Sequence, residues 1–213
     1  MAVLYIVATP IGNLQDITFR AVETLKRVDL ILCEDTRVTQ KLLSHYEIKT
    51  PTLSYHQHSK LNKIEYILDL LKQGKNLALV SDAGTPGISD PGNKLIAEFT
   101  QVQPVPGPSA LTAVASIAGF PMDRFLFLGF PPIKNKRKKF FEEVATSRYP
   151  VIFYESPYRI IKTLNEIEPL RDIVVGRELT KKFETVYRGK AKDVLNQLTK
   201  EEIRGEFVVI INR

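Results

Sequence analysis

The feature that most constrains the fold is a pattern that repeats through the first half of the chain. A short apolar run leads into a loop rich in Gly, Pro or short polar residues, and a helical stripe follows the loop. The runs cover residues 4–8, 30–33, 52–55, 77–80 and 102–105. Short buried strands that alternate with helices are typical of a mostly parallel sheet with helices on both faces. The sequence therefore predicts an α/β fold.

The pattern restarts after Gly119-Phe120-Pro121, and we expect two α/β domains, covering residues 1–118 and 119–213. Strands of the second domain are expected at 124–128, 151–154, 173–175, 184–188 and 207–211. A helix is expected over 158–167, begun by Ser156 and Pro157. We expect residues 184–188 to pair with the terminal strand as an antiparallel neighbour, which would make this a mixed sheet.

The net charge of +6 lies entirely in the second half of the chain. Residues 1–113 hold 11 basic and 11 acidic side chains, whereas residues 114–213 hold 19 and 13. The densest cluster consists of Lys134, Lys136, Arg137, Lys138 and Lys139. Such an asymmetry indicates a polyanionic partner such as a nucleic acid. A solvated helix start, paired with Glu142 and Glu143, would give the same pattern.

Several protein classes are excluded by composition. One cysteine cannot form a disulfide framework or a thiolate metal site, and the three histidines show no zinc-ligand spacing, so we expect no metal. No apolar run approaches about 20 residues, and the N-terminus has no basic segment before its apolar run. We therefore expect a cytoplasmic protein without a membrane partner.

Ligands of parallel α/β sheets bind at the carboxyl ends of the strands, which here end in loops of unusual composition. The loop 81–92 has three glycines and two prolines in twelve residues. Neither the G-x-G-x-x-G fingerprint of the Rossmann fold nor a P-loop occurs in the chain. The segment 34–37, Glu-Asp-Thr-Arg, is either a helix start or a site where Arg37 holds a phosphate.

Taken together, these loops resemble a known family. The chain is similar to the ribosomal RNA small-subunit methyltransferase I branch of the tetrapyrrole-methylase-like enzymes, which use S-adenosylmethionine. The matching segments follow the family's order and lie at 8–18, 34–37, 79–86, 90–92, 106–110, 153–156 and 177–181.

The resemblance implies a fold, a reaction and a cofactor. The fold would have two α/β domains with the cofactor in the cleft between them, usually in a homodimer. The reaction would be 2′-O-methylation of a cytidine ribose in the decoding region of small-subunit rRNA, on the 30S subunit. Carried over motif by motif, S-adenosylmethionine would contact Ile11, Gly12, Asp82, Ala83, Gly84, Pro86, Ser109, Ala110, Tyr154 and Leu179.

Methyl transfer to a ribose hydroxyl requires alignment and removal of a proton. Lys181 would stabilise the developing alkoxide, or act as the base if burial lowers its pKa. Glu155 and Glu178 are alternative bases, and each of these side chains would otherwise form a structural salt bridge. Arg37 and the five residues of the basic cluster would contact RNA.

One departure from the family concerns the end of the chain. Relatives usually continue into a small helical domain after the last strand, whereas this sequence ends at Arg213. We therefore expect the basic cluster to supply the RNA contacts. The alternatives are a methyltransferase of a small tetrapyrrole or other non-RNA substrate, and a ribosome-binding module without activity.

Overall fold

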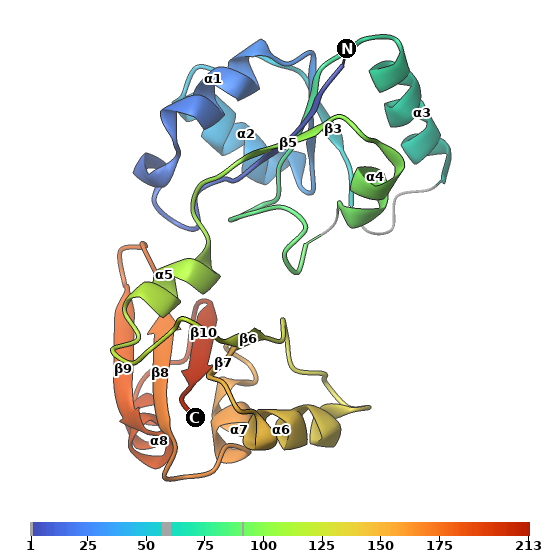
Figure 1. Cartoon of the computed structure of the whole chain (residues 1–213). Helices are drawn as coiled ribbons and strands as arrows, with labels where there is room; N and C mark the ends of the chain where they lie inside the picture. The colour runs from blue at the N-terminus through green and yellow to red at the C-terminus, as the bar shows by residue number, and fades with distance from the viewer. Residues whose placement is uncertain (1, 57–60, 91) are drawn as a thin grey trace. The chain divides into compact units, whose positions relative to one another are not determined.

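A computed structural model describes residues 2–56, 61–90 and 92–213 (Figure 1). It divides into two compact units, Met1–Ser109 and Ala110–Arg213. The division precedes the boundary expected after residue 118, because helix α5 (Ala110–Ser116) packs against strands of the second unit. Within the described ranges, no helix is long and apolar enough to cross a membrane.

Unit 1 contains a five-stranded parallel sheet, in the order β3-β2-β4-β1-β5. This confirms the parallel α/β arrangement predicted from the apolar runs. The strands are β1 (Leu4–Val7), β2 (Leu30–Cys33), β3 (Thr52–Ser54), β4 (Leu77–Leu79) and β5 (Val102–Val105).

Helices cover both faces of this sheet. They are α1 (Phe19–Arg27), α2 (Thr36–His45), α3 (Leu61–Lys72) and α4 (Asn93–Glu98), and a short 3-10 helix, η1 (Leu14–Asp16), precedes α1. Side chains of α1 and α2 share one buried cluster with Ile31 and Ala78. Side chains of α3 and α4 share another with Leu32 and Leu77. Neighbouring residues of β2 and β4 thus point to opposite faces, as a strand requires.

Unit 2 contains a mixed sheet in the order β6-β7-β10-β8-β9. Its strands are β6 (Leu126–Phe127), β7 (Val151–Glu155), β8 (Asp172–Arg177), β9 (Thr185–Lys190) and β10 (Phe207–Ile211). Strand β6 is parallel to β7, and all other pairs are antiparallel. The expected pairing of residues 184–188 with the terminal strand is wrong, because β10 lies between β7 and β8 and β9 pairs with β8 instead.

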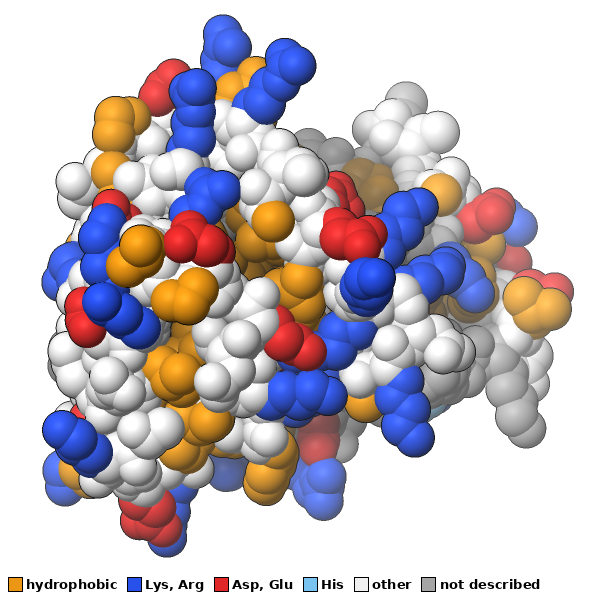
Figure 2. Space-filling view, turned by 90° about the horizontal axis from the view of Figure 1, so that it is seen from below, with side chains coloured by type: hydrophobic (Ala, Val, Ile, Leu, Met, Phe, Trp, Pro, Cys, Tyr) orange, Lys and Arg blue, Asp and Glu red, His pale blue; other side chains and the backbone are white. Residues whose placement is uncertain are grey.

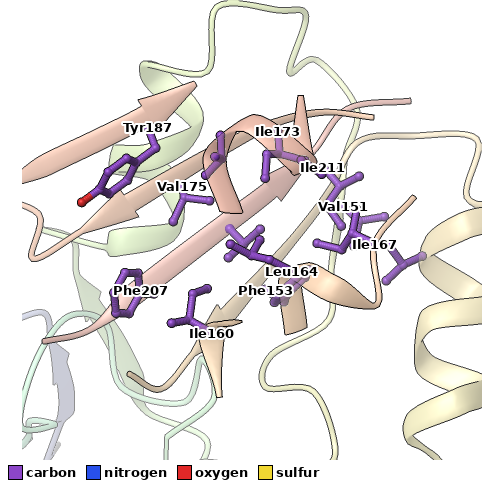
Figure 3. Close-up of a cluster of buried hydrophobic side chains, with 14 of the residues drawn as sticks. Val151, Phe153, Ile160, Leu164, Ile167, Ile173, Val175, Tyr187, Phe207 and Ile211 are labelled. Carbon is purple, nitrogen blue, oxygen red and sulfur yellow. The ribbon is translucent and has the colours of Figure 1, made fainter. Parts of the chain in front are cut away.

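One face of the second sheet forms the largest buried cluster of unit 2 (Figure 3). Phe153 of β7 and Val175 of β8 pack there with Ile160 and Leu164 of α7 (Ile160–Asn165). Helices α6 (Arg137–Thr146) and α8 (Ala191–Leu198) contribute to the same cluster. Helix α7 begins later than expected, because Ser156 and Pro157 lie in the turn that precedes it.

Candidate functional site

Three loops of unit 1 meet at the carboxyl ends of β4, β1 and β5. Thr9, after β1, and Gly84, after β4, form an isolated antiparallel bridge with N···O distances of 2.9 and 3.0 Å. The Thr85 hydroxyl donates to the carbonyl of Pro108, after β5, over 3.3 Å. The structure therefore brings together the loops that follow three neighbouring strands.

Gly84 sits at the centre of this junction and has a positive φ of 82°. Glycine adopts this conformation at little cost, whereas a side chain there is strained. A Cβ at this position would meet Ile11 Cγ2 at 3.5 Å and the Pro108 oxygen at 3.8 Å. The loops around Gly84 are thus close enough for one small ligand to contact all three through backbone groups.

The residues of unit 1 that were expected to contact the cofactor lie on these loops, and they differ in how far they are exposed to solvent. Ile11, Gly84 and Pro86 are buried and can form an apolar wall. Gly12, Asp82 and Ala83 are exposed, and Ser109 is half-buried. Ala110 is the first residue of α5 and therefore belongs to unit 2.

Three carboxylates gather at the ends of β2 and β4. Burial raises the pKa of Asp90 to about 6, and the nearby charges of Glu34 and Asp82 act in the same direction. Burial likewise raises the pKa of Glu34, again with a contribution from Asp82. Glu34 and Asp90 line a cavity of about 330 Å³ together with Tyr55 and Asn93. Among the residues that the structure describes, no three His, Cys, Asp or Glu side chains form a metal-binding group.

Asp90 and Glu34 lie in segments that match the family but are not among the site residues named from the sequence. One signal in the sequence pointed to these two carboxylates: Glu34 directly follows β2, and the Asp90 loop follows β4, its neighbour in the sheet.

Arg37 lies on α2, beside the same strand ends. Asp35 caps α2 by accepting from the Arg37 backbone N–H at 2.8 Å, so the segment is a helix start. The Arg37 guanidinium also donates to Asp35, and these bonds lower the pKa of Asp35 to about 2. The Arg37 side chain is nevertheless largely exposed, so its other N–H groups can still reach a phosphate.

In unit 2, Lys181 lies between two carboxylates. Its Nζ donates to Glu178 Oε1 at 2.8 Å and to Glu206 Oε2 at 2.9 Å. Glu178 Oε1 also accepts from the Glu206 backbone N–H at 2.8 Å. Glu178 has a positive φ of 52°, and a Cβ at Gly205 would collide with its side chain. The local backbone is thus shaped around this charge cluster.

The charge cluster fixes the protonation states of its members. Burial acts to lower the pKa of Lys181, but the hydrogen bonds to Glu178 and Glu206 outweigh it and raise the pKa. Burial acts to raise the pKa of Glu178, but bonds from Lys181 and the Glu206 backbone outweigh it and lower the pKa. Lys181 is therefore a cation near neutral pH, which removes the expectation that it acts as a base.

Two expected cofactor contacts of unit 2 are apolar or aromatic. Leu179 is buried and packs against Gly176 of β8, where a Cβ would lie 3.0 Å from a Leu179 methyl carbon. Tyr154 of β7 is half-buried, and its ring packs against Phe127 and Phe130 with centroid distances of 5.1 and 5.4 Å.

The structure places Glu155 in a salt bridge within unit 2, which was the alternative to a catalytic base. Its carboxylate is fully buried and accepts from Ser156 N at 2.8 Å and from Thr163 Oγ1 at 2.6 Å. It also pairs with Arg159 Nη2 at 2.7 Å. Both oxygens are therefore engaged within unit 2, and Glu155 serves the fold.

Arg137, which was expected to contact RNA, is only 6% exposed. Its guanidinium pairs with Glu166 at 2.6 Å and donates to Thr163 Oγ1 at 2.8 Å. The remaining members of the cluster, Lys134, Lys136, Lys138 and Lys139, are all exposed. Figure 2 shows Lys and Arg side chains spread among exposed hydrophobic ones on the face seen from below.

The geometry suits a ligand held by backbone groups and apolar walls, and the family follows from comparison with known proteins. The family model for tetrapyrrole (corrin/porphyrin) methylases matches residues 3–195. The chain therefore belongs to the tetrapyrrole methylase family and is an S-adenosylmethionine-dependent methyltransferase.

Its relatives narrow this class to the group of ribosomal RNA small subunit methyltransferase I. The protein of that name from Synechocystis sp. is 46% identical over 99% of this chain and 79% of its own. The one from Bacillus subtilis is 45% identical over 99% of this chain and 75% of its own. The one from Thermotoga maritima is 43% identical, over 100% of this chain and 99% of its own length.

Solved structures support the fold alone. A cobalt precorrin-4 methyltransferase matches with a TM-score of 0.71 at 20% identity, over 99% of this chain and 94% of its own. A uroporphyrin-III-C-methyltransferase from Thermus thermophilus matches with a TM-score of 0.66 at 13% identity, over 100% of this chain and 94% of its own.

Proposed function

We propose that this protein methylates the 2′-hydroxyl of a cytidine ribose in the decoding region of 16S rRNA, on the 30S subunit in the cytoplasm. The observation that carries the proposal is the likeness, across essentially the whole chain, to relatives named ribosomal RNA small subunit methyltransferase I. The exposed lysines of unit 2 support it, because a polyanionic substrate requires cations. The working form is a homodimer, and light scattering during size-exclusion chromatography tests this part.

The cofactor supplies a methyl group that its sulfonium already activates. We assign the loops around Gly84 and Ile11 to cofactor binding in unit 1, because they present backbone groups and an apolar wall. In unit 2 we assign Leu179 and Tyr154 to the same role, as buried and half-buried apolar surfaces. These contacts align the reactants and exclude water, which is the main source of acceleration for such a transfer.

We assign Lys181 to the stabilisation of negative charge on the ribose oxygen as it loses its proton. Its pKa is raised, so it carries the positive charge that this role requires. Glu178 and Glu206 hold the ammonium group in place, and Glu178 is the carboxylate left as a candidate base. Its lowered pKa keeps it ionised, although it makes Glu178 a weak base. Arg37 is assigned to a phosphate of the substrate.

The test is methyl transfer from labelled S-adenosylmethionine into purified, undermethylated 30S subunits, with 50S subunits and a tetrapyrrole precursor as parallel substrates. We expect label in the 30S rRNA alone. Transfer to the tetrapyrrole would establish a small-molecule enzyme on the same scaffold. Cofactor binding without transfer to any substrate would point to a ribosome-binding module.

The role of Lys181 has its own test. Lys181→Ala should reduce turnover by about 10²–10³-fold, the effect of losing one charge-stabilising donor, and leave cofactor affinity unchanged. Lys181→Arg keeps the charge and should recover part of the activity. Equal turnover of the wild-type and alanine proteins would remove Lys181 from the mechanism.

A further inference from the structure

Two segments of unit 2 expose aromatic or apolar side chains that no part of the proposed mechanism uses. Phe130 is 52% exposed and Ile133 is 69% exposed, both in the loop between β6 and α6. Tyr158 is 95% exposed, in the turn between β7 and α7. Single exposed apolar residues are common on protein surfaces, whereas a group of them beside charged residues marks a site where a partner binds.

Arg159 forms hydrogen bonds to both exposed segments, the loop between β6 and α6 and the turn between β7 and α7. Its Nη1 donates to the carbonyl of Pro131 at 3.0 Å, and its Nε donates to Ser156 Oγ at 3.2 Å. Its Nη2 pairs with the buried carboxylate of Glu155 at 2.7 Å. The residue next to Phe130 and the residue next to Tyr158 are therefore joined by a direct hydrogen bond.

Arg137 fixes the loop at a second point. Its Nη1 donates to the carbonyl of Pro132 at 2.9 Å, while the rest of its guanidinium is held by Glu166 and Thr163. Two guanidinium groups thus bind two consecutive proline carbonyls. Such a loop is preorganised, which lowers the entropy lost when a ligand binds to it.

The Phe130 ring also packs against other aromatic rings of unit 2. It packs against Tyr154 at 5.4 Å between centroids, and Tyr154 packs in turn against Phe127 at 5.1 Å. One side of Phe130 therefore contacts protein, while about half of the residue is open to solvent. A base can stack on a ring held in this way without first ordering it.

The charge around these rings favours RNA over a second copy of the chain. Lys134, Lys136, Lys138 and Lys139 follow directly after Ile133 and are all exposed. Two copies of such a surface would repel each other, whereas phosphates would be attracted to it. Aromatic rings beside cations are the combination that binds unpaired nucleotides, because bases stack on the rings and cations follow the backbone.

We propose that Phe130 and Tyr158 form a stacking surface for unpaired bases of the RNA substrate, with the four lysines at its phosphates. Glu155, Arg159 and Arg137 are positioning residues that hold this surface. The proposal rests on the proposed function and names residues of unit 2 that contact the RNA substrate.

The experiment measures binding of the full chain to a short single-stranded RNA, and to the same RNA paired into a duplex. The variants are Phe130→Ala, Tyr158→Ala and Tyr158→Phe, with Tyr66→Ala, an exposed tyrosine of α3 in unit 1, as the matched control. Each alanine variant of the surface should bind the single strand about 5- to 150-fold more weakly, as expected for one lost stacked base. Tyr158→Phe keeps the ring and should bind like the wild type, as should Tyr66→Ala.

The salt dependence separates stacking from charge. Loss of an uncharged ring should leave the slope of log affinity against log salt unchanged, because no phosphate contact is lost. Equal binding by all variants would overturn the proposal, as would a shift of oligomeric state in the alanine variants, which would mark the rings as a contact between copies. If the proposed function itself fails, the wild-type protein does not methylate 30S subunits, a result that is read separately from the binding of the variants.

Because Tyr158 has little contact with the protein, its replacement tests the surface without disturbing the fold. Turnover adds a second readout. At saturating 30S subunits, Tyr158→Ala should retain kcat and show a raised KM, since the ring binds substrate away from the reacting atoms.

Discussion

Replacing Glu155 by glutamine separates a structural role from a catalytic one. Glutamine keeps the shape of the side chain and can still accept from Ser156 N and contact Thr163. It removes the negative charge that faces Arg159 at 2.7 Å. The guanidinium is then left partly buried, with its side chain 22% exposed and no opposite charge from residue 155.

The expected loss of stability can be reached in two ways, which share the contact between Glu155 and Arg159. Removing one partner of a buried ion pair costs about 3–5 kcal/mol, and the partial exposure of Arg159 favours the lower end. Hydrogen bonds to a charged acceptor contribute about 1 kcal/mol more than neutral ones, and Glu155 accepts three. Both arguments give about 3 kcal/mol for Glu155→Gln.

The matched control is Glu142→Gln. Glu142 and Lys138 are also four residues apart and oppositely charged, but their side chains are 60% and 92% exposed and 3.9 Å apart. Such a surface pair contributes at most about 0.5 kcal/mol. The chain has no tryptophan, so urea unfolding is followed by far-ultraviolet circular dichroism and by hydrogen exchange of the β7 and β10 amides.

We expect Glu155→Gln to lose about 3 kcal/mol of unfolding free energy and to keep its kcat at a temperature where it is folded. The reasoning is refuted if Glu155→Gln is as stable as Glu142→Gln. It is refuted equally if stability holds while kcat falls by the roughly 10²–10⁴-fold typical of a lost general base.

Three further predictions concern the pKa of Asp90, the charge of the exposed lysines and the backbone conformation of Gly84. Asp90 has a pKa of about 6 in the folded chain against an ordinary 3.8, so its contribution to stability is present below pH 3.8 and lost as the pH rises through 6. Unfolding measured between these values should show that Asp90→Asn flattens the decline; an unchanged pH dependence would contradict this assignment. Replacing Lys134, Lys136, Lys138 and Lys139 by alanine should reduce the salt slope of single-stranded RNA binding by about 2.8, whereas an unaltered slope would exclude them as phosphate contacts. Gly84→Ala should cost about 1–2 kcal/mol of stability because φ is 82°, and should weaken cofactor binding in calorimetry; wild-type values of both would show that neither the turn nor the ligand depends on this glycine.

The parallel sheet of unit 1 was predictable because its strands are buried on both faces. Residues of β2 and β4 read as continuous apolar runs, and loops full of Gly and Pro mark where each strand ends. The order of strands in unit 2 was not predictable, because β9 and β10 can each pair antiparallel with several neighbours. Contacts distant in sequence, such as those of β10 with β7, decide that order.

Two side chains named as site candidates are buried, and the sequence carried a signal for the burial of each. Arg137 stands in a run of cations, but it lies three residues before Phe140 and seven before Val144, so all three share the buried face of α6. Glu155 follows Val151 and Phe153 at the two-residue period of a strand, so it continues the buried face of β7. In both cases the spacing from buried neighbours in the same element predicts burial better than the residue type does.

Only one of the two carboxylates that bind Lys181 could be predicted from the sequence. Lys181 lies three residues after Glu178, so these two are neighbours in the sequence, whereas Glu206 directly precedes β10 and lies far along the chain. Two carboxylates rather than one set the charge of this lysine. A sequence pattern carries no signal for that third member, because the contact depends on the placement of β10 beside β8.

The proposed reaction moves the methyl group to a ribose oxygen of a cytidine in small-subunit rRNA. The most direct measurement isolates 16S rRNA from 30S subunits treated with this protein and S-adenosylmethionine, digests it to nucleosides and identifies the methylated product by mass spectrometry. We expect 2′-O-methylcytidine, formed about 10²–10³-fold more slowly when the Lys181→Ala protein is used. A methyl group on a base, or no methylated nucleoside at all, would contradict it.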